Sequence, residues 1–345
     1  FQLIGRLLKT SHLPFYIFWV LILVFCQPAT LKADVWSFFW ENDLLVGSDD
    51  QYTNGIGLAW FSDNLCSDQL SYFEREYGDL MSDVVESLPN VNLEQCQNLA
   101  GIKVFQQIIT PTDTSEENLI EDDVPYAGYF SITFLLMNQN EDSTSRYHIS
   151  LGVIGPQSGA ETTQKSFHRL IGNDEPKGWK HQLKTQYTVG VGYHNASIIV
   201  DLNTGAGNKF DLSRIGGVEL GNFFSGAHIG GKLRYGYNFP SLEDFVDGVG
   251  LEGTGSSFKA TTQSLDYGWS INLSAYLTAV AHIYVIDNAS SHDLDRRTLY
   301  YSQAFSVSLY LEKIQISFSI EGIVALFRDS LLNSGWGGVE LSRRF

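Results

Sequence analysis

The chain has 345 residues, and its 39 acidic and 22 basic residues give a formal net charge of −17 at pH 7. A balance this acidic excludes a nucleic-acid-binding protein, because binding to phosphates requires clustered positive charge. It also makes an anionic lipid surface an unfavourable partner unless divalent cations or a local basic cluster mediate the contact.

The first 33 residues have the composition of a secretory signal peptide. Basic residues precede an apolar run from Leu13 to Phe25, and Ala33 is a small residue suited to cleavage before Asp34. The run is shorter than the roughly 20 residues that a membrane-spanning helix requires. We therefore predict a signal peptide over 1–33 in preference to an uncleaved signal anchor, and a mature chain over 34–345. The leader removes basic residues only, so the mature chain is more acidic still.

Segments of about ten residues in the mature chain alternate between apolar and polar or small side chains. In one of them, Ile316 and Phe318 alternate with Ser317 and Ser319. A period of two residues is typical of a strand with one face toward lipid and the other toward a polar interior. About ten residues also suffice for a tilted strand to cross a bilayer. We predict twelve such strands, near residues 34–43, 52–61, 101–110, 126–138, 145–154, 183–197, 206–221, 226–238, 267–285, 299–311, 313–325 and 335–345.

The predicted fold is therefore all-β: a membrane-spanning antiparallel β-barrel of about 12 strands, with a short helix in an extracellular loop, in the outer membrane of a Gram-negative bacterium. A soluble secreted barrel would instead pack apolar side chains in its lumen, whereas Asn272 and Ser274 have lumen parity here. Four basic side chains share the lumen face and are interpreted as structural partners of acids such as Glu321: His148, His228, Lys232 and Arg234.

An even number of strands places both ends of the barrel chain in the periplasm, so every odd-numbered connection lies outside the cell. The predicted extracellular loops are 44–51, 111–125, 155–182, 286–298 and 326–334. The 62–100 segment becomes a long periplasmic insertion, with a helix from Tyr72 to Leu88. Cys66 and Cys96 lie in this insertion, and they form one disulfide or remain two buried free thiols.

Two amides at the tips of the first two strands have an unexpected parity. Asn42 is in phase with the apolar residues of the first strand, and Asn54 with those of the second, so both look outward. A polar side chain facing lipid is expensive unless something covers it, which predicts a site on the barrel exterior beneath a helix over 158–171. Asp43 and Thr53 have the opposite parity and reach that site only through a bulge near the strand tips.

The third outer loop contains the helix that would cover this site. Ser158 and Glu161 have the spacing of a capping box, and Gly172 is suited to end the helix. Gln164 and His168 are four residues apart, so they point from the same face of it.

Several short motifs follow one another in a fixed order between positions 36 and 182. In chain order they are Asn42-Asp43, Tyr52-Thr53-Asn54-Gly55, Thr110-Pro111, Pro125-Tyr126-Ala127-Gly128, Gly155-Pro156 with Gln164-x-x-x-His168, and Gly178-Trp179. Their order resembles the outer-membrane lipid A 3′-O-deacylases of the LpxR type. The resemblance implies a twelve-stranded barrel whose active site lies between the outer wall and the loop helix, and which hydrolyses an ester acyl chain from lipid A with calcium. It also implies a functional set with His168 as the base: Asn42, Asp43, Thr53, Gln164 and His168.

The chemistry of these residues agrees with the resemblance. Ester hydrolysis needs a base that titrates near neutral pH, a water molecule and positive charge where the oxyanion forms, and His168 supplies the first. Calcium prefers oxygen ligands, which Asp43 with Asp174 or Glu175 can provide. No Gly-x-Ser-x-Gly motif occurs in the chain, so we predict direct attack by water without a covalent intermediate.

Binding residues are assigned around this catalytic set. We predict metal binding by Asp43 and Asp174, and substrate binding by Asn54, Tyr126, Lys165 and Arg169. The family usually has a basic residue before Pro125-Tyr126, where this chain has Val124, so a contact to a lipid A phosphate would come from the third loop: Lys165, Arg169, Lys177 or Lys180. The expected partner is lipid A or lipopolysaccharide in the outer leaflet, and the expected state is a monomer.

Each of these residues also has a plainer interpretation. A histidine in a loop helix is usually a surface residue, and Asn-Asp and Thr-Asn-Gly are common in turns. The alternative function is a non-enzymatic small porin or surface adhesin. Gln164 and His168 on one face of a helix, together with an Asn-Asp strand tip, argue against it, because a pore requires neither.

Overall fold

The computed structural model of the protein describes residues 35–46, 51–68, 70–88, 93, 98–240, 246–247, 257–258, 265–294, 298–325 and 333–345. The predicted signal peptide over 1–33 and Cys96 lie outside these residues.

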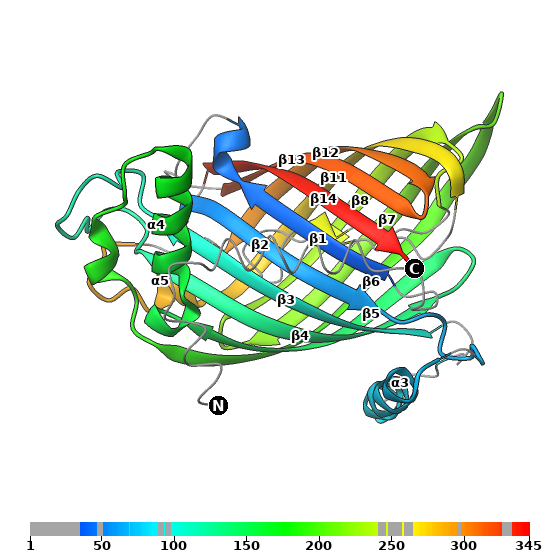
Figure 1. Ribbon diagram of the computed structural model, residues 1–345, viewed down its shortest axis with the longest axis horizontal. Coiled ribbons are helices and arrows are strands. Elements are labelled where there is room, and N and C mark those ends of the chain that lie inside the picture. The colour runs from blue at the N-terminus through cyan, green and yellow to red at the C-terminus, as the bar shows by residue number, and fades with distance from the viewer. Residues whose placement is uncertain are drawn as a thin grey trace.

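Twelve antiparallel strands close into one barrel, as the alternation predicts (Figure 1). In chain order they are β1 (Val35–Asn42), β2 (Gln51–Phe61), β3 (Asn98–Thr110), β4 (Ala127–Gln139), β5 (Ser143–Ile154), β6 (Gln186–Gly205), β7 (Asn208–Gly221), β8 (Phe224–Tyr237), β11 (Leu265–Ile283), β12 (Leu299–Glu312), β13 (Ile314–Ala325) and β14 (Asn333–Arg344). Strands adjacent in the chain pair with each other, β8 pairs with β11, and β1 pairs with β14 to close the barrel. Each strand overlaps a predicted one, so the predicted fold class is confirmed.

A short separate sheet lies between β8 and β11 in the chain. It consists of β9 (Val246–Asp247) and β10 (Ser257–Phe258), which pair antiparallel. β10 contacts β1 and β14, so this connection returns to the barrel seam where the first and last strands meet.

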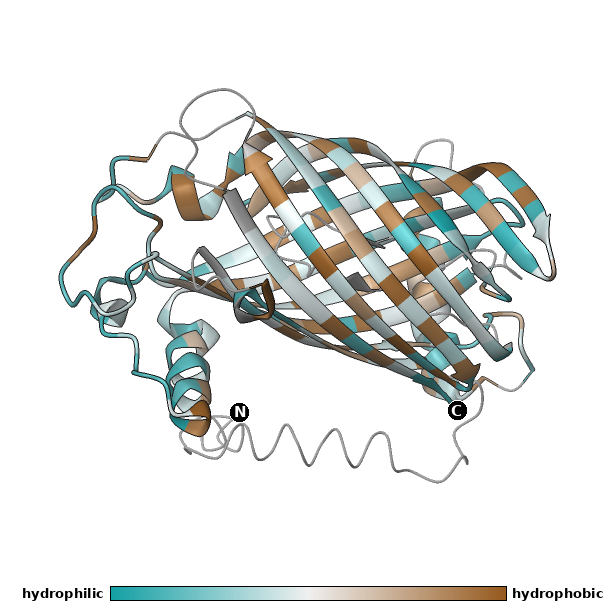
Figure 2. Cartoon of the chain, turned by 90° about the horizontal axis from the view of Figure 1, so that it is seen from above, coloured by the Kyte–Doolittle hydropathy of each residue, from teal (hydrophilic) through white to brown (hydrophobic). Residues whose placement is uncertain are grey.

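The two faces of the barrel wall differ in chemistry. On β11, Ser270, Asn272 and Ser274 are buried on the lumen side, whereas Leu273 between them is 54% exposed on the outside. The same alternation divides the strands into hydrophilic and hydrophobic bands in Figure 2. Apolar residues outward and polar residues inward suit a barrel in lipid. The polar lumen predicted from the alternation is therefore present.

Basic side chains inside the barrel meet acids of other strands. Arg234 on β8 donates to both carboxylate oxygens of Asp211 on β7, at 2.9 Å from Nε and 2.6 Å from Nη2, and neither side chain is exposed. His148 on β5 lies 2.7 Å from Glu219 on β7. The buried charge of Arg234 is tolerated because Asp211 is paired with it. Arg234 thus pairs with an acid as predicted, and that acid is Asp211, while His148 lies close to Glu219.

The 62–100 insertion carries α3 (Tyr72–Glu86), which lies at one end of the barrel (Figure 1). Its first turn is closed by a reciprocal cap: Ser71 Oγ accepts from the Glu74 amide at 3.3 Å, and Glu74 Oε2 accepts from the Ser71 amide at 2.6 Å. The helix predicted in this insertion is thus present. Cys66 is disulfide-bonded, so the alternative of two free thiols is wrong, and its partner lies outside the described residues.

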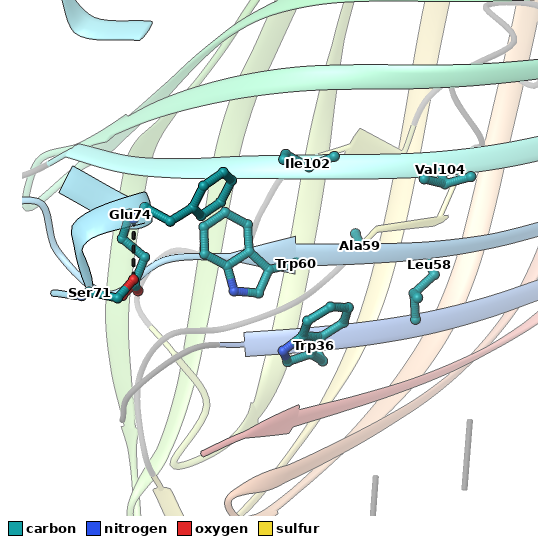
Figure 3. Close-up of a pocket in the computed structure, with 9 residues that line it drawn as sticks. Trp36, Leu58, Ala59, Trp60, Ser71, Glu74, Ile102 and Val104 are labelled. Atoms are coloured by element: carbon teal, nitrogen blue, oxygen red, sulfur yellow. Dashed lines mark hydrogen bonds between the residues drawn. The ribbon is translucent and has the colours of Figure 1, made fainter. Parts of the chain in front are cut away.

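One face of α3 packs on the outer wall of the barrel. Tyr77 donates from its hydroxyl to the Gly101 carbonyl at 2.7 Å, and the ring of Phe73 lies 5.9 Å from that of Trp60. Figure 3 shows the apolar groove beside this contact, between the helix and the strands that carry Trp36 and Leu58. An amphipathic helix held against the wall in this way suits a membrane interface. The insertion is therefore attached to the wall, at least over α3.

The opposite end of the barrel, here called the loop end, carries the remaining helical segments (Figure 1). They are η1 (Asp43–Val46), η3 (Pro156–Ser158), α4 (Ala160–Ile171), η4 (Gly178–His181) and α5 (Tyr284–Asp287). In the part of the chain that the structure describes, no helix combines the length and apolarity needed to cross a bilayer. β1 ends and β2 begins at the loop end, so the fold brings the predicted strand-tip residues and α4 to the same end of the molecule.

Candidate active site

α4 lies against the outside of the barrel wall. Gln106 on β3 donates from Nε2 to the Ser158 carbonyl at 2.7 Å, and the ring of Phe167 lies 6.1 Å from that of Trp40 on β1. Gly128 on β4 permits the close approach, because a Cβ at this position would collide with Ala160 and Ser158. The helix is thus held at both ends against β1, β3 and β4.

The two ends of α4 differ in how they match the prediction. The predicted capping box of Ser158 and Glu161 is wrong, because the N-cap is Gly159 with a φ of 74° and no side chain caps the helix. Ser158 instead ends the preceding turn η3, and its hydroxyl donates to the Gly155 carbonyl at 2.7 Å. The predicted end is confirmed: Gly172 has a φ of 78° and its amide bonds the last turn of the helix.

His168 lies on the face of α4 that is turned away from solvent. It is 5% exposed, and its Nδ1 lies 2.6 Å from the backbone carbonyl oxygen of Asp174. A carbonyl oxygen can only accept, so Nδ1 carries the hydrogen when the imidazole is neutral. The lone pair of the neutral ring is then on Nε2, and the ring orientation is fixed by the Asp174 carbonyl.

Gln164 is also buried, at 2% exposure, one turn earlier on the same face. Its Oε1 accepts from the indole Nε1 of Trp179 at 2.8 Å. Because an indole can only donate, this bond settles which end of the amide is the oxygen. The Gln164 Nε2 group is buried and has no hydrogen-bond partner among the described residues. An unsatisfied buried donor of this kind is uncommon and indicates a missing partner such as water or a ligand.

Trp179 and Tyr126 form the back wall behind Gln164. Their ring centroids are 5.0 Å apart, and they belong to one buried apolar cluster with Ile108 and Ala160. Tyr126 is 4% exposed, and its hydroxyl donates to the Thr114 carbonyl at 3.3 Å. Its position supports the helix, and a direct contact with substrate stays a prediction.

The strand tips contribute a second group of polar residues. Asn42 is 2% exposed although it has the outward parity, and its Nδ2 donates to the Thr53 carbonyl at 3.0 Å. Asn54 Oδ1 accepts from the outward-facing Trp40 Nε1 at 3.1 Å, and the Trp40 ring packs on α4. Both outward amides are thus sheltered from lipid, as the parity argument requires.

A β-bulge reorients Thr53. The pairing of β2 with β3 passes from Tyr52–Ile109 directly to Asn54–Ile108, so Thr53 is the extra residue. Its Oγ1 lies 2.6 Å from Oγ1 of Thr110, which has the outward parity of Ile108. The predicted bulge is present, and it turns Thr53 to the outer side.

Asp43 leaves the strand ladder altogether. β1 ends at Asn42, and Asp43 is the first residue of η1, fully buried. η1 packs against the outer wall, because a Cβ at Gly337 of β14, the strand partner of Asn42, would touch Leu45. A strand that continued regularly through Asp43 would have directed its side chain into the lumen, away from Asn42. The strand ends at Asn42, so this objection to a shared site does not apply.

The charged residues of the third loop line the rim of this site. Lys165 pairs with Glu161 at 2.7 Å, and Arg169 lies 3.5 Å from Glu175 on the surface. The side chain of Asp174 is exposed, while its carbonyl holds His168. The exposed carboxylate of Asp174 is therefore less suited to a buried metal than the buried carboxylate of Asp43. The ligand role of Asp174 stays a prediction.

A second ion pair links this rim to the 111–125 loop. Lys180 of η4 donates to Glu117 at 2.8 Å. This hydrogen bond and the positive charge of Lys180 lower the pKa of the Glu117 carboxyl below 4.5. This ion pair therefore joins the third loop to the 111–125 loop.

The residues of this site fit a hard divalent cation by their chemistry. Asp43 offers a buried carboxylate and Asn42 an amide oxygen, since Nδ2 of Asn42 is directed to Thr53. An all-oxygen donor set suits calcium. The contacts of Trp179, Thr110 and the Asp174 carbonyl were not predictable from spacing, although Trp179 and Thr110 belong to the motifs that carry the family resemblance.

Comparison with known proteins finds one matching family and several solved barrels. The family described as outer membrane protein LpxR matches residues 16–345. The solved structure of LpxR from Salmonella typhimurium has a TM-score of 0.71 at 14% identity, covering 90% of this chain and 100% of that chain. The β domain of the Bordetella autotransporter BrkA has a TM-score of 0.44 at 7% identity, covering 91% of this chain and 100% of that chain. An outer-membrane channel from Pseudomonas putida F1 has a TM-score of 0.39 at 10% identity, covering 92% and 99%.

No curated protein sequence matches the chain. The family match nevertheless extends over nearly all of it, from residue 16 to residue 345. The twelve-stranded barrel with its polar lumen accords with that match, and an outer-membrane location in a Gram-negative bacterium follows. The chain belongs to the LpxR family of outer-membrane proteins.

Proposed function

We propose that the protein is an outer-membrane esterase of the lipid A 3′-O-deacylase type, which removes an ester-linked acyl chain from lipid A with water activated by His168. The observation that carries the proposal is the imidazole of His168, which lies on the buried face of α4 and is fixed through Nδ1 by the Asp174 carbonyl. A base needs a fixed orientation and a nitrogen that can accept a proton; the Asp174 carbonyl fixes the ring, and Nε2 of the neutral ring carries the lone pair.

Gln164 is the hydrogen-bond donor in this proposal. Its oxygen is engaged by Trp179, so only its amide hydrogens are available to a ligand. A donor that is already oriented and shielded from water stabilises a developing oxyanion better than a mobile one. Asn42 and Thr53 act as positioning residues, because the bond from Asn42 to the Thr53 carbonyl ties the tips of β1 and β2 together.

Calcium belongs to the proposal through Asp43 and Asn42, which would hold the ion. When bound, a divalent cation supplies positive charge next to the scissile ester. His168 accepts the proton of the water, Gln164 donates to the substrate, and the wall of α4 excludes bulk water from the reacting atoms.

The position of the site suits a substrate that stays in the membrane. It lies on the outside of the wall at the loop end, which we place at the outer leaflet, so an acyl chain can enter without leaving lipid. The phosphate groups of lipid A would meet cations of the rim: Lys165, Arg169, Lys177 and Lys180. Val124 is fully buried and cannot take that role. The monomer stays a prediction.

The test is mass spectrometry of lipid A from cells that express the wild type or His168→Ala, with and without a calcium chelator. We expect a lipid A species lacking one acyl chain only with the wild type and without the chelator. His292→Ala is the matched control, because His292 lies on another loop at the same end. Identical lipid A in every sample would contradict the enzyme and favour the porin or adhesin.

A further inference from the structure

Three side chains that the proposed esterase does not use meet inside the barrel. His148 of β5, His194 of β6 and Glu219 of β7 are all buried, and one ligand atom from each lies within 4.8 Å of the others. The Glu219 Oε2 atom is 2.7 Å from Nε2 of His148 and 3.8 Å from Nε2 of His194. They face the lumen, whereas α4 covers the outer side of β1, β3 and β4.

The strand register and two glycines bring these side chains together. Gly192 of β6 stands directly between His148 and Glu219, as the Cα partner of both. A Cβ at Gly192 would collide with both side chains, so only glycine lets them meet across the intervening strand. Gly217 of β7 has the same relation to His194 and leaves space beside its ring.

The polar atoms of this cluster are not satisfied by hydrogen bonds among the described residues. Both ring nitrogens of His148, Nε2 of His194 and Oε2 of Glu219 are buried without such a partner. His148 and Glu219 are therefore close enough for a hydrogen bond but lack its direction. Buried polar atoms are nearly always satisfied in proteins. A cation bonded to Nε2 of both rings and to Oε2 would satisfy three of these four atoms at once.

The ligand types and the surrounding charges select the kind of cation. Two imidazoles and one carboxylate, with a further position for water, are a common zinc set, whereas calcium and magnesium require mostly oxygen. Arg146 on β5 is the strand partner of His194, and the ring of His228 on β8 lies 5.0 Å from that of His194. A single carboxylate in such surroundings attracts a hard cation poorly, whereas imidazole nitrogen is a preferred ligand of zinc.

We propose that His148, His194 and Glu219 form a divalent transition-metal site, most simply for zinc, in the lumen of the barrel. The ion cross-links three adjacent strands, β5, β6 and β7, and so stabilises this part of the wall. This site is distinct in its ligands and in its side of the wall from the calcium site of the proposed esterase.

The test uses the full mature barrel refolded in detergent and stripped of metal. Zinc binding is followed by calorimetry and by the rise in melting temperature, and cobalt serves as a spectroscopic probe of the coordination. We expect one ion per chain, with X-ray absorption showing two imidazole nitrogens. Because even the loss of a supporting contact weakens metal sites about 10–100-fold, His194→Gln and Glu219→Gln should weaken binding by about 100-fold or more.

His292→Gln is the matched control, since His292 lies on the loop that follows α5 and belongs to none of the strands β5, β6 and β7. It should bind zinc as the wild type does, and so should His168→Ala. Absence of zinc binding by the wild type, or equal binding by the wild type and Glu219→Gln, would overturn the proposal. If the ligand variants fail to fold, the wild-type absorption spectrum decides, because a first shell without two imidazoles would also overturn it.

Discussion

Trp179 is the residue that fixes Gln164, and Trp179→Phe isolates this interaction. The Trp179 side chain is almost completely buried, and its only described hydrogen bond is the 2.8 Å bond to Gln164 Oε1. Phenylalanine keeps most of the apolar contact with Tyr126 but removes the donor. The Gln164 oxygen is then a buried acceptor that has lost its partner, which costs about 1–3 kcal/mol.

This cost sets the expected loss of activity. Without the indole, no hydrogen bond holds the Gln164 amide in the orientation that directs Nε2 to the substrate. Each 1.36 kcal/mol of transition-state stabilisation that is lost slows the reaction about tenfold. If the whole cost appears in the transition state, kcat/KM for acyl release falls about 5- to 150-fold. The assay is the initial rate of fatty-acid release from lipid A in mixed micelles by purified protein.

Two further variants separate orientation from general damage. Trp36→Phe, which changes a tryptophan in the groove beside α3, should leave the rate unchanged. Gln164→Ala combined with Trp179→Phe should be no slower than Gln164→Ala alone, since Trp179 acts through Gln164. A Trp179→Phe protein with the full rate, or a double variant in which the two losses add, would refute the role assigned to Gln164.

Three other predictions follow from contacts of the loop end and the lumen. Gly128→Leu must displace Ala160 and Ser158, so α4 moves from the wall and acyl release should fall by about 100-fold or more. The barrel should still fold, as judged by its heat-modifiable migration on gels. An unchanged rate would show that acyl release does not require α4 to be held against the wall. Lys180→Met should raise the pKa of Glu117, which an NMR titration measures. Because that pKa is lowered in the folded protein, the ion pair stabilises the fold above the pKa of the unfolded chain, and this stability is lost as the pH falls through the lowered pKa. An unchanged pKa of Glu117 in the variant would contradict the pairing. A calcium-selective chelator should stop acyl release and leave the zinc-dependent rise in melting temperature unchanged. A zinc-selective chelator should abolish that rise and leave acyl release unchanged. If either chelator abolishes both, the protein has one metal site and not two.

The alternation of side chains is sufficient to predict the barrel because lipid imposes it on every strand. It fails where a strand leaves the membrane. β6 was predicted to end at 197 but continues to Gly205, since its last residues pair with β7 in water and Asp201 forms an ion pair with Lys209 at 2.8 Å. The short sheet of β9 and β10 has no periodic signal at all, because two-residue strands are too short to show one.

Some features of the candidate site were likewise predictable from the sequence, and others were not. The outward parity of Asn42 and Asn54 and the bulge at Thr53 were predictable, because a polar residue on a lipid face demands a cover or a local irregularity. The partner of His168 was not, since a backbone carbonyl carries no residue-specific signal. Nor was the meeting of His148 with Glu219, because parity places both in the lumen but only the register across Gly192 puts them side by side.

The placement of a polar site outside the barrel has a physical cost that α4 explains. Asn42 and Asn54 occupy positions where the other strand residues face lipid, and an uncovered polar group there is expensive. α4 packs beside these positions, with Phe167 on the Trp40 ring that bonds Asn54, and its own polar side chains Gln164 and His168 are buried as well. The cover holds only while the helix stays close, which Gly128 permits at β4 and Phe167 secures at β1. It follows that loosening α4 exposes polar groups of both surfaces to lipid, so the clamp that aligns the proposed catalytic residues is also favoured by the membrane itself.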